Sequence, residues 1–139
     1  MRASINIGVS YSLSQRSLTA LKGVHPSMVR VVKRAILITD QDFLITCGVR
    51  TPAEQAKLYA QGRTKPGKKV TWTLTSNHFV QKSGYGHAVD LAPFPVDWND
   101  RRKFHVIASA MKQAALAEGV KIVWGGDWGT PDLPHFELA

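Results

Sequence analysis

The chain has 139 residues, of which 44% are hydrophobic and 20% charged, and this is typical of one globular domain with a single core. No apolar run approaches the roughly 20 residues of a membrane-spanning helix, so we expect no stable membrane insertion. The 18 basic and 10 acidic residues give a formal net charge of +8, which favours an anionic partner: nucleic acid, a membrane surface or an anionic polymer.

The cysteine count and the distribution of the basic residues exclude or disfavour several kinds of site and partner. Cys47 is the single cysteine, which excludes an internal disulfide and a cysteine-rich metal site. Its apolar flanks predict a buried small residue rather than a nucleophile. The basic residues lack the interleaved aromatic residues of an RNA-binding sheet, so nucleic acid is disfavoured. No apolar segment follows Arg2, so we expect no signal peptide and synthesis in the cytosol.

Two short helices are expected near the N-terminus, on either side of a turn at residues 23–26. Leu18 and Leu21 have helical spacing in the first helix. Pro26 suits the first turn of the second helix. The predicted buried stripe of that second helix consists of Met28, Val31, Val32, Ala35 and Ile36.

A short strand and a capped helix are expected next. Residues 42–47 are apolar and partly β-branched, which predicts a buried strand that ends at Gly48. Thr51, Pro52 and Glu54 form the pattern of a capping box at the start of a helix. This helix should have about nine residues and end near Gly62. The apolar residues near one of its sides are Ala53, Ala56, Leu58 and Tyr59.

The second half of the chain is predicted to hold a long loop, a helix and three strands. Residues 63–86 form the loop, with a β-prone piece at 70–74, and long loops in compact domains are often functional. Strands are expected at 88–92, 120–124 and 135–138. A helix over 101–118 should begin after the acidic segment 97–100 and end at Gly119, with a buried stripe of Phe104, Ile107, Ala108, Met111, Ala115 and Leu116. The strand order favours an α+β fold with a small antiparallel sheet flanked by helices.

Residues capable of metal or acid–base chemistry lie beside the predicted strands. A catalytic zinc ion needs three ligands from His, Asp or Glu and one open position for water. His78, Asp90 and His135 would supply two imidazoles and a carboxylate. Asp132, three residues before His135, is placed to take a proton from that water.

Several motifs, in this order, resemble a known family. The chain contains Ser76-x-His78, Gly86-x-Ala88-x-Asp90, Trp128 and Asp132-x-x-His135. These motifs are similar to those of zinc peptidases that cut bacterial peptidoglycan peptides. This group includes the VanY-like D-alanyl-D-alanine carboxypeptidases and, closer in size and layout, the phage L-alanyl-D-glutamate endopeptidases, which are endolysins. Two further segments look like family elements: Arg50-Thr51 with Gln55, and Asp97-Trp98.

The resemblance implies a role for each matching residue. His78, Asp90 and His135 would bind Zn²⁺, and Asp132 would be the catalytic acid and base. Arg50 would hold a substrate carboxylate or polarise the scissile carbonyl. Substrate contacts are implied for Ser76, Gln55 and Trp128. The resemblance also implies a hedgehog-like and D-alanyl-D-alanine-peptidase-like fold, with residues 1–139 as one catalytic domain and no separate wall-binding domain.

The spacing between the first two ligands departs from the family pattern. The family places a histidine three residues before the first glycine of Gly-x-Ala-x-Asp, and that position is Ser83 here. Serine is a poor zinc ligand, so we interpret the difference as five residues inserted within 79–85, which keeps His78 as the ligand. His87 is the alternative ligand.

The acid–base and cationic residues also have competing interpretations. Glu137 alternates with His135 on one strand face, which makes it a rival to Asp132 as the base. Asp132 also fits an ordinary turn residue, and Arg50 could instead pair with Glu54.

Together these observations predict a monomeric zinc endopeptidase that hydrolyses peptidoglycan stem peptides, at the L-alanyl-D-glutamate bond, and lyses bacteria. The enzyme would be made in the host cytoplasm and reach the wall after another protein has permeabilised the membrane. Its positive charge fits attraction to an anionic wall. Two rival functions are a D-alanyl-D-alanine carboxypeptidase and a non-catalytic wall-binding or virion structural module.

Overall fold

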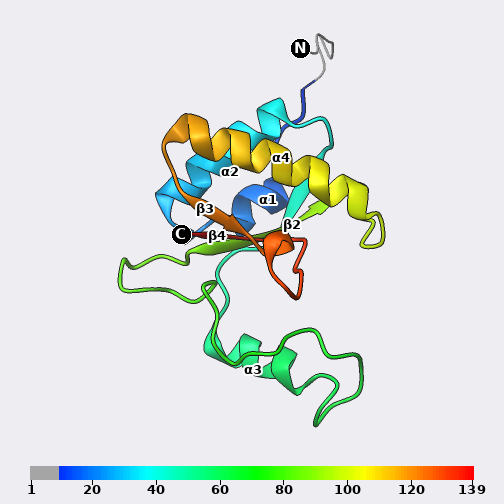
Figure 1. The fold of residues 1–139 in the computed structure, drawn as a ribbon. Coiled ribbons are helices and arrows are strands. Elements are labelled where there is room, and N and C mark those ends of the chain that lie inside the picture. Colours follow the sequence, from blue (N-terminus) through cyan, green and yellow to red (C-terminus); the bar gives the residue numbers. More distant parts are fainter. Residues whose placement is uncertain (1–9) are drawn as a thin grey trace.

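The structure is a computed structural model and describes residues 10–139. Within these residues, four strands form one antiparallel sheet in the order β1-β2-β4-β3 (Figure 1). The strands are β1 (Phe43–Cys47), β2 (Ala88–Pro93), β3 (Ile122–Trp124) and β4 (His135–Leu138). The predicted α+β fold with a small antiparallel sheet is therefore confirmed, and β2 and β4 lie side by side at its centre.

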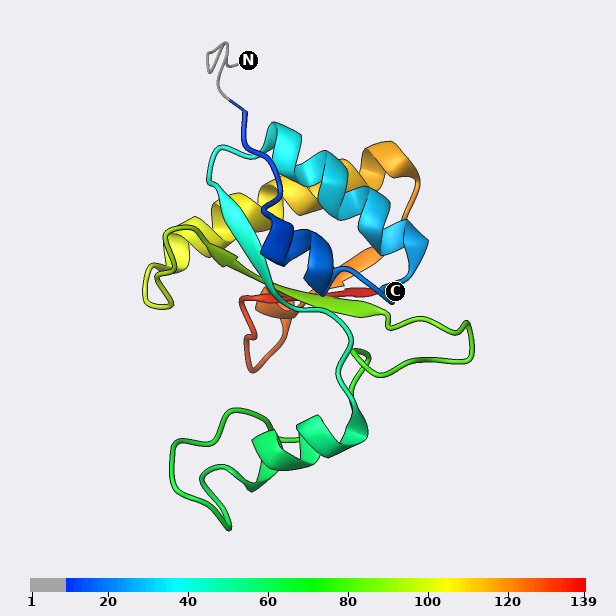
Figure 2. The same ribbon diagram turned by 180° about the vertical axis from the view of Figure 1, so that it is seen from behind.

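Three helices cover one face of the sheet. They are α1 (Gln15–Ala20), α2 (Pro26–Ile38) and α4 (Arg101–Glu118), and Figure 2 shows them on the same side from behind. The buried stripe predicted for α2 faces the core, where it packs with Ile107 and Met111 of α4 and with Leu91 of β2. Burial of apolar side chains between these helices and the sheet therefore stabilises this half of the molecule.

The predicted ends of α4 are confirmed, whereas helix α3 (Pro52–Ala60) ends two residues before the predicted Gly62. The Asp100 side chain accepts a hydrogen bond from the Lys103 amide at the start of α4, and Gly119 ends that helix in the left-handed conformation. One residue of the predicted stripe was wrong, because Leu116 is 85% exposed. Ala114 is buried instead, since α4 packs through its small residues there.

Helix α3 (Pro52–Ala60) lies on the other side of the sheet from the covering helices (Figures 1 and 2). Together with the loop that follows it, residues 61–77, it forms a projection that we call the arm (residues 52–77). The capping box between Thr51 and Glu54 begins α3 as predicted. The β-prone piece at 70–74 is not a strand within the described residues. The hydrophobic core of the described chain includes no arm residue.

The short 3-10 helix η1 (Gly125–Asp127) leads from β3 into the loop before β4. Among the described residues, no helix combines the length and apolar character that a bilayer crossing requires.

Candidate active site

A cleft of about 1050 Å³ separates the arm from the sheet. The arm side of the cleft includes Gln55 and Thr73, and the sheet side includes Asp90, His135 and Glu137. Arg50, which lies between β1 and α3, also lines it. The cleft therefore brings together residues from both halves of the chain, as was expected from their positions beside the strands.

Asp90 lies at the centre of this cluster. The antiparallel register places it opposite His135 of β4 and Cys47 of β1. One carboxylate oxygen, Asp90 Oδ1, is 3.3 Å from His78 Nε2 and 3.2 Å from His135 Nδ1. Two imidazoles that are distant in sequence thus face a single carboxylate oxygen.

His78 reaches Asp90 because the segment after it folds back on itself. The Gln81 amide donates to the Tyr85 carbonyl, and the His87 amide donates to the Asn77 carbonyl at 2.8 Å, which closes the base of a small hairpin at residues 78–86. A Cβ atom on Gly86 would lie 2.9 Å from the His78 carbonyl oxygen, so this close approach needs glycine. The segment between His78 and Gly86 therefore folds back without separating His78 from Asp90.

His87 occupies a different position from His78. Its Nε2 atom lies 2.8 Å from Ser83 Oγ, and its ring contacts that of His25 at 5.3 Å between centroids. His25 itself accepts a hydrogen bond from the Ser27 amide at the start of α2. Of the two candidate histidines, His78 is the one beside Asp90.

Neighbouring groups orient both imidazoles toward Asp90. His78 Nδ1 is 2.7 Å from the Gly48 carbonyl oxygen, which can only accept a hydrogen bond. His78 therefore carries its proton on Nδ1 when neutral, and Nε2 is left with a lone pair. His135 Nε2 is 2.7 Å from Glu137 Oε1, so its Nδ1 faces Asp90. Glu137 is held in turn by the Asn77 side-chain amide at 2.8 Å.

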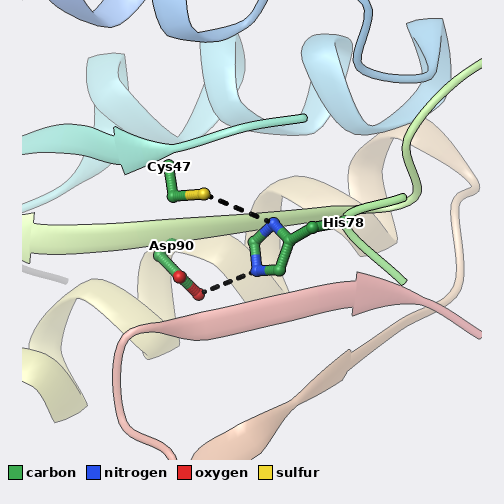
Figure 3. Close-up of side chains that lie close together, drawn as sticks. All are labelled: Cys47, His78 and Asp90. Carbon is green, nitrogen blue, oxygen red and sulfur yellow. Dashed lines mark hydrogen bonds and ion pairs between the residues drawn. The ribbon is translucent and has the colours of Figure 1, made fainter. Parts of the chain in front are cut away.

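Cys47, His78 and Asp90 form a possible metal-binding group among the described residues, with one potential ligand atom from each within 4.8 Å of the others. Figure 3 shows the imidazole between the other two side chains, with a different ring nitrogen facing each. The sulfur is 3.8 Å from Nδ1, the nitrogen engaged by the Gly48 carbonyl. The other ring nitrogen of His78, Nε2, instead faces Asp90, and the ring centroid lies 5.1 Å from that of His135.

The ionisable side chains of this cluster shift one another's pKa values. Burial alone would lower the pKa of His78, but hydrogen bonding and the charge of Asp90 raise it to about 10. Burial alone would raise the pKa of Asp90, yet the hydrogen bonds from His135 and His78 hold it well below its usual range. The Asp90 carboxylate therefore stabilises a proton on each of the two imidazoles.

Arg50 extends the cluster toward the arm. Its Nη2 atom lies 3.4 Å from Asp90 Oδ2, and its Nη1 donates to Gln55 Oε1 at 2.8 Å. Glu54 does not take the role of ion-pair partner considered for it. Its carboxylate accepts a hydrogen bond from the Thr51 amide instead. The guanidinium group thus faces the cleft with its position fixed from two sides.

Asp132 lies at the exposed rim of the cleft, in the turn that leads into β4. Its amide donates to the Gly125 carbonyl, and its carbonyl accepts from the His135 amide. A Cβ atom on Gly125 would lie 2.4 Å from the Asp132 carbonyl oxygen, so the turn also needs a glycine there. Partial desolvation and then the charge of Asp90 raise the pKa of Asp132.

Comparisons with known proteins agree with this arrangement. A model of the family described as "Phage L-alanyl-D-glutamate peptidase" matches residues 9–138. The L-alanyl-D-glutamate peptidase of Escherichia phage T5 is 31% identical over 136 residues, which cover 94% of this chain and 90% of that protein. The chain belongs to the phage L-alanyl-D-glutamate peptidase family.

Two further relatives of the family support this assignment. The peptidoglycan L-alanyl-D-glutamate endopeptidase CwlK of Bacillus subtilis is 32% identical over 108 residues, covering 70% of this chain and 60% of that protein. The crystal structure of the L-Ala D-Glu endopeptidase ChiX from Serratia marcescens superposes with a TM-score of 0.79 at 33% identity, covering 96% of this chain and 94% of that one. The fold predicted from the family resemblance is therefore confirmed.

The three residues predicted to contact the substrate, Ser76, Gln55 and Trp128, all line the cleft of this phage peptidase. Trp128 is 40% exposed, and its ring lies 5.3 Å from that of His135. Ser76 Oγ accepts a hydrogen bond from the His78 amide, so it also shapes the turn that places this ligand candidate. Gln55 is only 1% exposed. Contact of these residues with substrate stays a prediction.

Two features of the cluster escaped the sequence analysis. Cys47 was expected to be a buried small residue, but it is half-buried and its sulfur accepts a hydrogen bond from Arg50. Its position as the last residue of β1, three residues before Arg50, could have indicated that it lies beside the site. Glu137 was considered as a base, whereas the structure places its carboxylate against His135.

Proposed function

We propose that this chain is a zinc-dependent peptidoglycan endopeptidase that hydrolyses the bond between L-alanine and D-glutamate in the stem peptide and so lyses bacteria. Membership in the family and the composition of the cleft support this proposal. The observation that carries it is the convergence of His78 and His135 on one oxygen of Asp90, within a chain that matches these peptidases over nearly its whole length.

We propose His78, Asp90 and His135 as the metal ligands, through Nε2, Oδ1 and Nδ1. Ligand atoms about 2.1 Å from a tetrahedral zinc ion lie roughly 3.4 Å from one another. The distances of 3.3 and 3.2 Å from Asp90 Oδ1 fit this spacing. The hydrogen bonds of the opposite ring nitrogens to Gly48 and Glu137 are of the kind that orient histidine ligands. When bound, zinc acidifies water and polarises the scissile carbonyl.

Cys47 is less suited as a third ligand than His135. Its sulfur approaches the nitrogen of His78 that already contacts the Gly48 carbonyl, and one imidazole nitrogen cannot serve both partners. We therefore assign Cys47 to the neighbourhood of the site, where its sulfur accepts a hydrogen bond from Arg50.

Asp132 is proposed as the acid and base of the reaction. Its carboxylate takes a proton from the attacking water while the water oxygen bonds to the carbonyl carbon of L-alanine. The same carboxyl then gives the proton to the leaving nitrogen of D-glutamate as the carbon–nitrogen bond breaks. Its raised pKa favours the first step, because a carboxylate with a higher pKa is a stronger base toward the attacking water.

Arg50 would stabilise negative charge on the substrate. Its guanidinium group can donate to the carbonyl oxygen as charge develops there, or to a carboxylate of the stem peptide. Its place between the sheet and the arm supports either role.

The decisive experiment is digestion of purified peptidoglycan followed by identification of the new chain ends. New amino groups on D-glutamate support the proposal. Release of D-alanine alone would indicate a carboxypeptidase, and zinc-loaded protein that binds the wall without cutting it would indicate a non-catalytic module. Asp132→Ala is the matched control, since it removes the proposed base and leaves the proposed ligands in place.

The setting of this activity is also part of the proposal. We propose a monomer that is made in the host cytoplasm and reaches the wall once the membrane has been permeabilised. The names of the relatives, which are peptidases of this bond, and the net charge of +8 support an anionic wall as its partner.

A further inference from the structure

Gln55 has an environment that is unusual for a polar residue at the wall of a cleft. It is 1% exposed, and among the described residues of α3 it is the one that is buried. Its Oε1 accepts from Arg50 Nη1 at 2.8 Å, and its Nε2 donates to Thr71 Oγ1 at 3.1 Å and to the Thr73 carbonyl at 2.8 Å. The amide is therefore engaged with the protein on both sides.

The partners fix the orientation of this amide. Arg50 can only donate hydrogen bonds and the Thr73 carbonyl can only accept them. Rotation of the amide by 180° would place two donors together and two acceptors together. The guanidinium of Arg50 and the return segment of the arm are thus joined through one side chain in one orientation.

This connection matters because the arm has no part in the described hydrophobic core. Other hydrogen bonds, such as those from Arg63 Nη1 to the carbonyls of Tyr59 and Thr71, tie the arm to itself. Gln55 instead connects the arm to the sheet. Its Nε2 donates to the Thr73 carbonyl, its Oε1 accepts from Arg50, and Arg50 in turn contacts Asp90 Oδ2.

We propose that Gln55 is a positioning residue: it holds the Arg50 guanidinium in its working orientation and couples that orientation to the place of the arm. This role replaces the direct substrate contact predicted from the sequence, and it rests on the proposed function of Arg50. Both N–H donors of this buried amide are used within the protein, so none is left for a substrate.

Steady-state kinetics of Gln55→Leu, Arg50→Ala and the double variant on soluble stem peptides test the proposal. Leucine keeps the volume and removes the amide. We expect kcat/KM to fall roughly 10–100-fold in Gln55→Leu. The loss should appear in the same kinetic parameter, kcat or KM, that Arg50→Ala changes. Because Gln55 acts through Arg50, the double variant should lie within about twofold of Arg50→Ala. Multiplication of the two losses, or kinetics of Gln55→Leu like those of the wild type, would overturn the proposal.

Two further variants, Gln55→Glu and Gln61→Leu, test separately the orientation of Arg50 and its coupling to the arm. Glutamate keeps an acceptor for Arg50 but loses the donors to Thr71 and Thr73, so kcat should stay closer to the wild type while amides 61–75 exchange faster with deuterium. Gln61 donates only within the arm, to the Lys68 carbonyl at 3.0 Å. Gln61 also lines the cleft, so Gln61→Leu is the control for loss of an arm hydrogen bond and not for substrate binding, and it should leave kcat within about twofold.

A readout that needs no activity distinguishes failure of this proposal from failure of the proposed function. The NMR order parameter of the Arg50 Nε–Hε group should fall in Gln55→Leu and stay unchanged in Gln61→Leu. Unchanged order in both variants refutes the positioning role, even if the wild type cuts peptidoglycan. Absence of cutting by the wild type refutes the proposed function, while the NMR result still decides the role of Gln55.

Discussion

The helix-covered sheet and the arm are held together in different ways. The sheet packs against α1, α2 and α4 through fully buried side chains such as Met28, Leu91 and Met111. The arm contributes no residue to that core, and it is held by the hydrogen bonds of the buried Gln55 amide and by others that are partly buried or exposed. The cleft lies between a side fixed by apolar packing and a side fixed by directional polar bonds. The proposed ligands lie on the first side, and Arg50 joins the two.

The largest effect is expected for the proposed ligands, which all belong to the sheet side or to the hairpin attached to it. Alanine at His78 or Asp90 should abolish cutting of peptidoglycan and reduce bound zinc, measured by mass spectrometry, to a small fraction of one ion. His87→Ala is the control and should retain the metal. Loss of zinc in His87→Ala with retention in His78→Ala would reverse our assignment.

Arg50→Ala tests the residue that joins the sheet to the arm. Zinc content should stay near that of the wild type, because the proposed ligands are untouched. Activity should fall roughly 10²–10³-fold, as expected for removal of one group that stabilises developing charge. A variant that loses its metal would show that Arg50 supports the ligands rather than the substrate.

Asp132→Asn should reduce kcat roughly 10²–10⁴-fold, the range for loss of a general acid and base, with zinc retained. In the wild type, the base works only when ionised. Its pKa is raised, so activity should fall as the pH drops through a value above the ordinary 3.8. This acidic limb of the pH profile of kcat/KM should disappear in the residual activity of Asp132→Asn. Persistence of the limb would point to another base, with Glu137 the first to test.

Stability separates the two regions most directly. Met111→Ala should lower the free energy of unfolding by about 2–5 kcal/mol, since it leaves a cavity in the core. Leu58→Ala, in the half-buried face of α3, should cost less than about 1 kcal/mol. Urea unfolding of both variants checks this difference, and equal losses would show that the arm belongs to the cooperative core.

The smallest effect is expected at the far end of α4. Leu116 is 85% exposed despite its place in the predicted stripe, so Leu116→Ala should change the free energy of unfolding by no more than about 0.5 kcal/mol. A larger loss would mean that this side chain is covered in solution.

The sequence predicted the parts of the fold that follow from local rules. Helical spacing identified α2, the Thr51 and Asp100 caps identified the starts of α3 and α4, and β-branched apolar runs identified β1. These features depend on neighbours in sequence, so they can be recognised without knowing the fold. The burial of Gln55 could not be recognised in this way, because its partners Thr71 and Thr73 are far along a loop without periodicity.

The residues of the candidate site were chosen from ligand chemistry and motif order, and not from any predicted contact between them. The spacing of His78 from Asp90 gave no indication that the two meet, because the intervening hairpin has to close first. The contact of Cys47 with His78 was not predicted, because it forms only when β1 comes into register with β2. Glu137 was placed on the same strand face as His135, but as a rival base and not as the partner of its ring.

The hairpin at residues 78–86 has a practical consequence for engineering. The amide of His87 and the carbonyl of Asn77 close its base, so the placement of His78 depends on that base and not on the length of the tip. Residues 82–84 at the tip are exposed. A short targeting peptide or a fluorescent tag inserted there should leave the base of the hairpin, and with it the position of His78, unchanged.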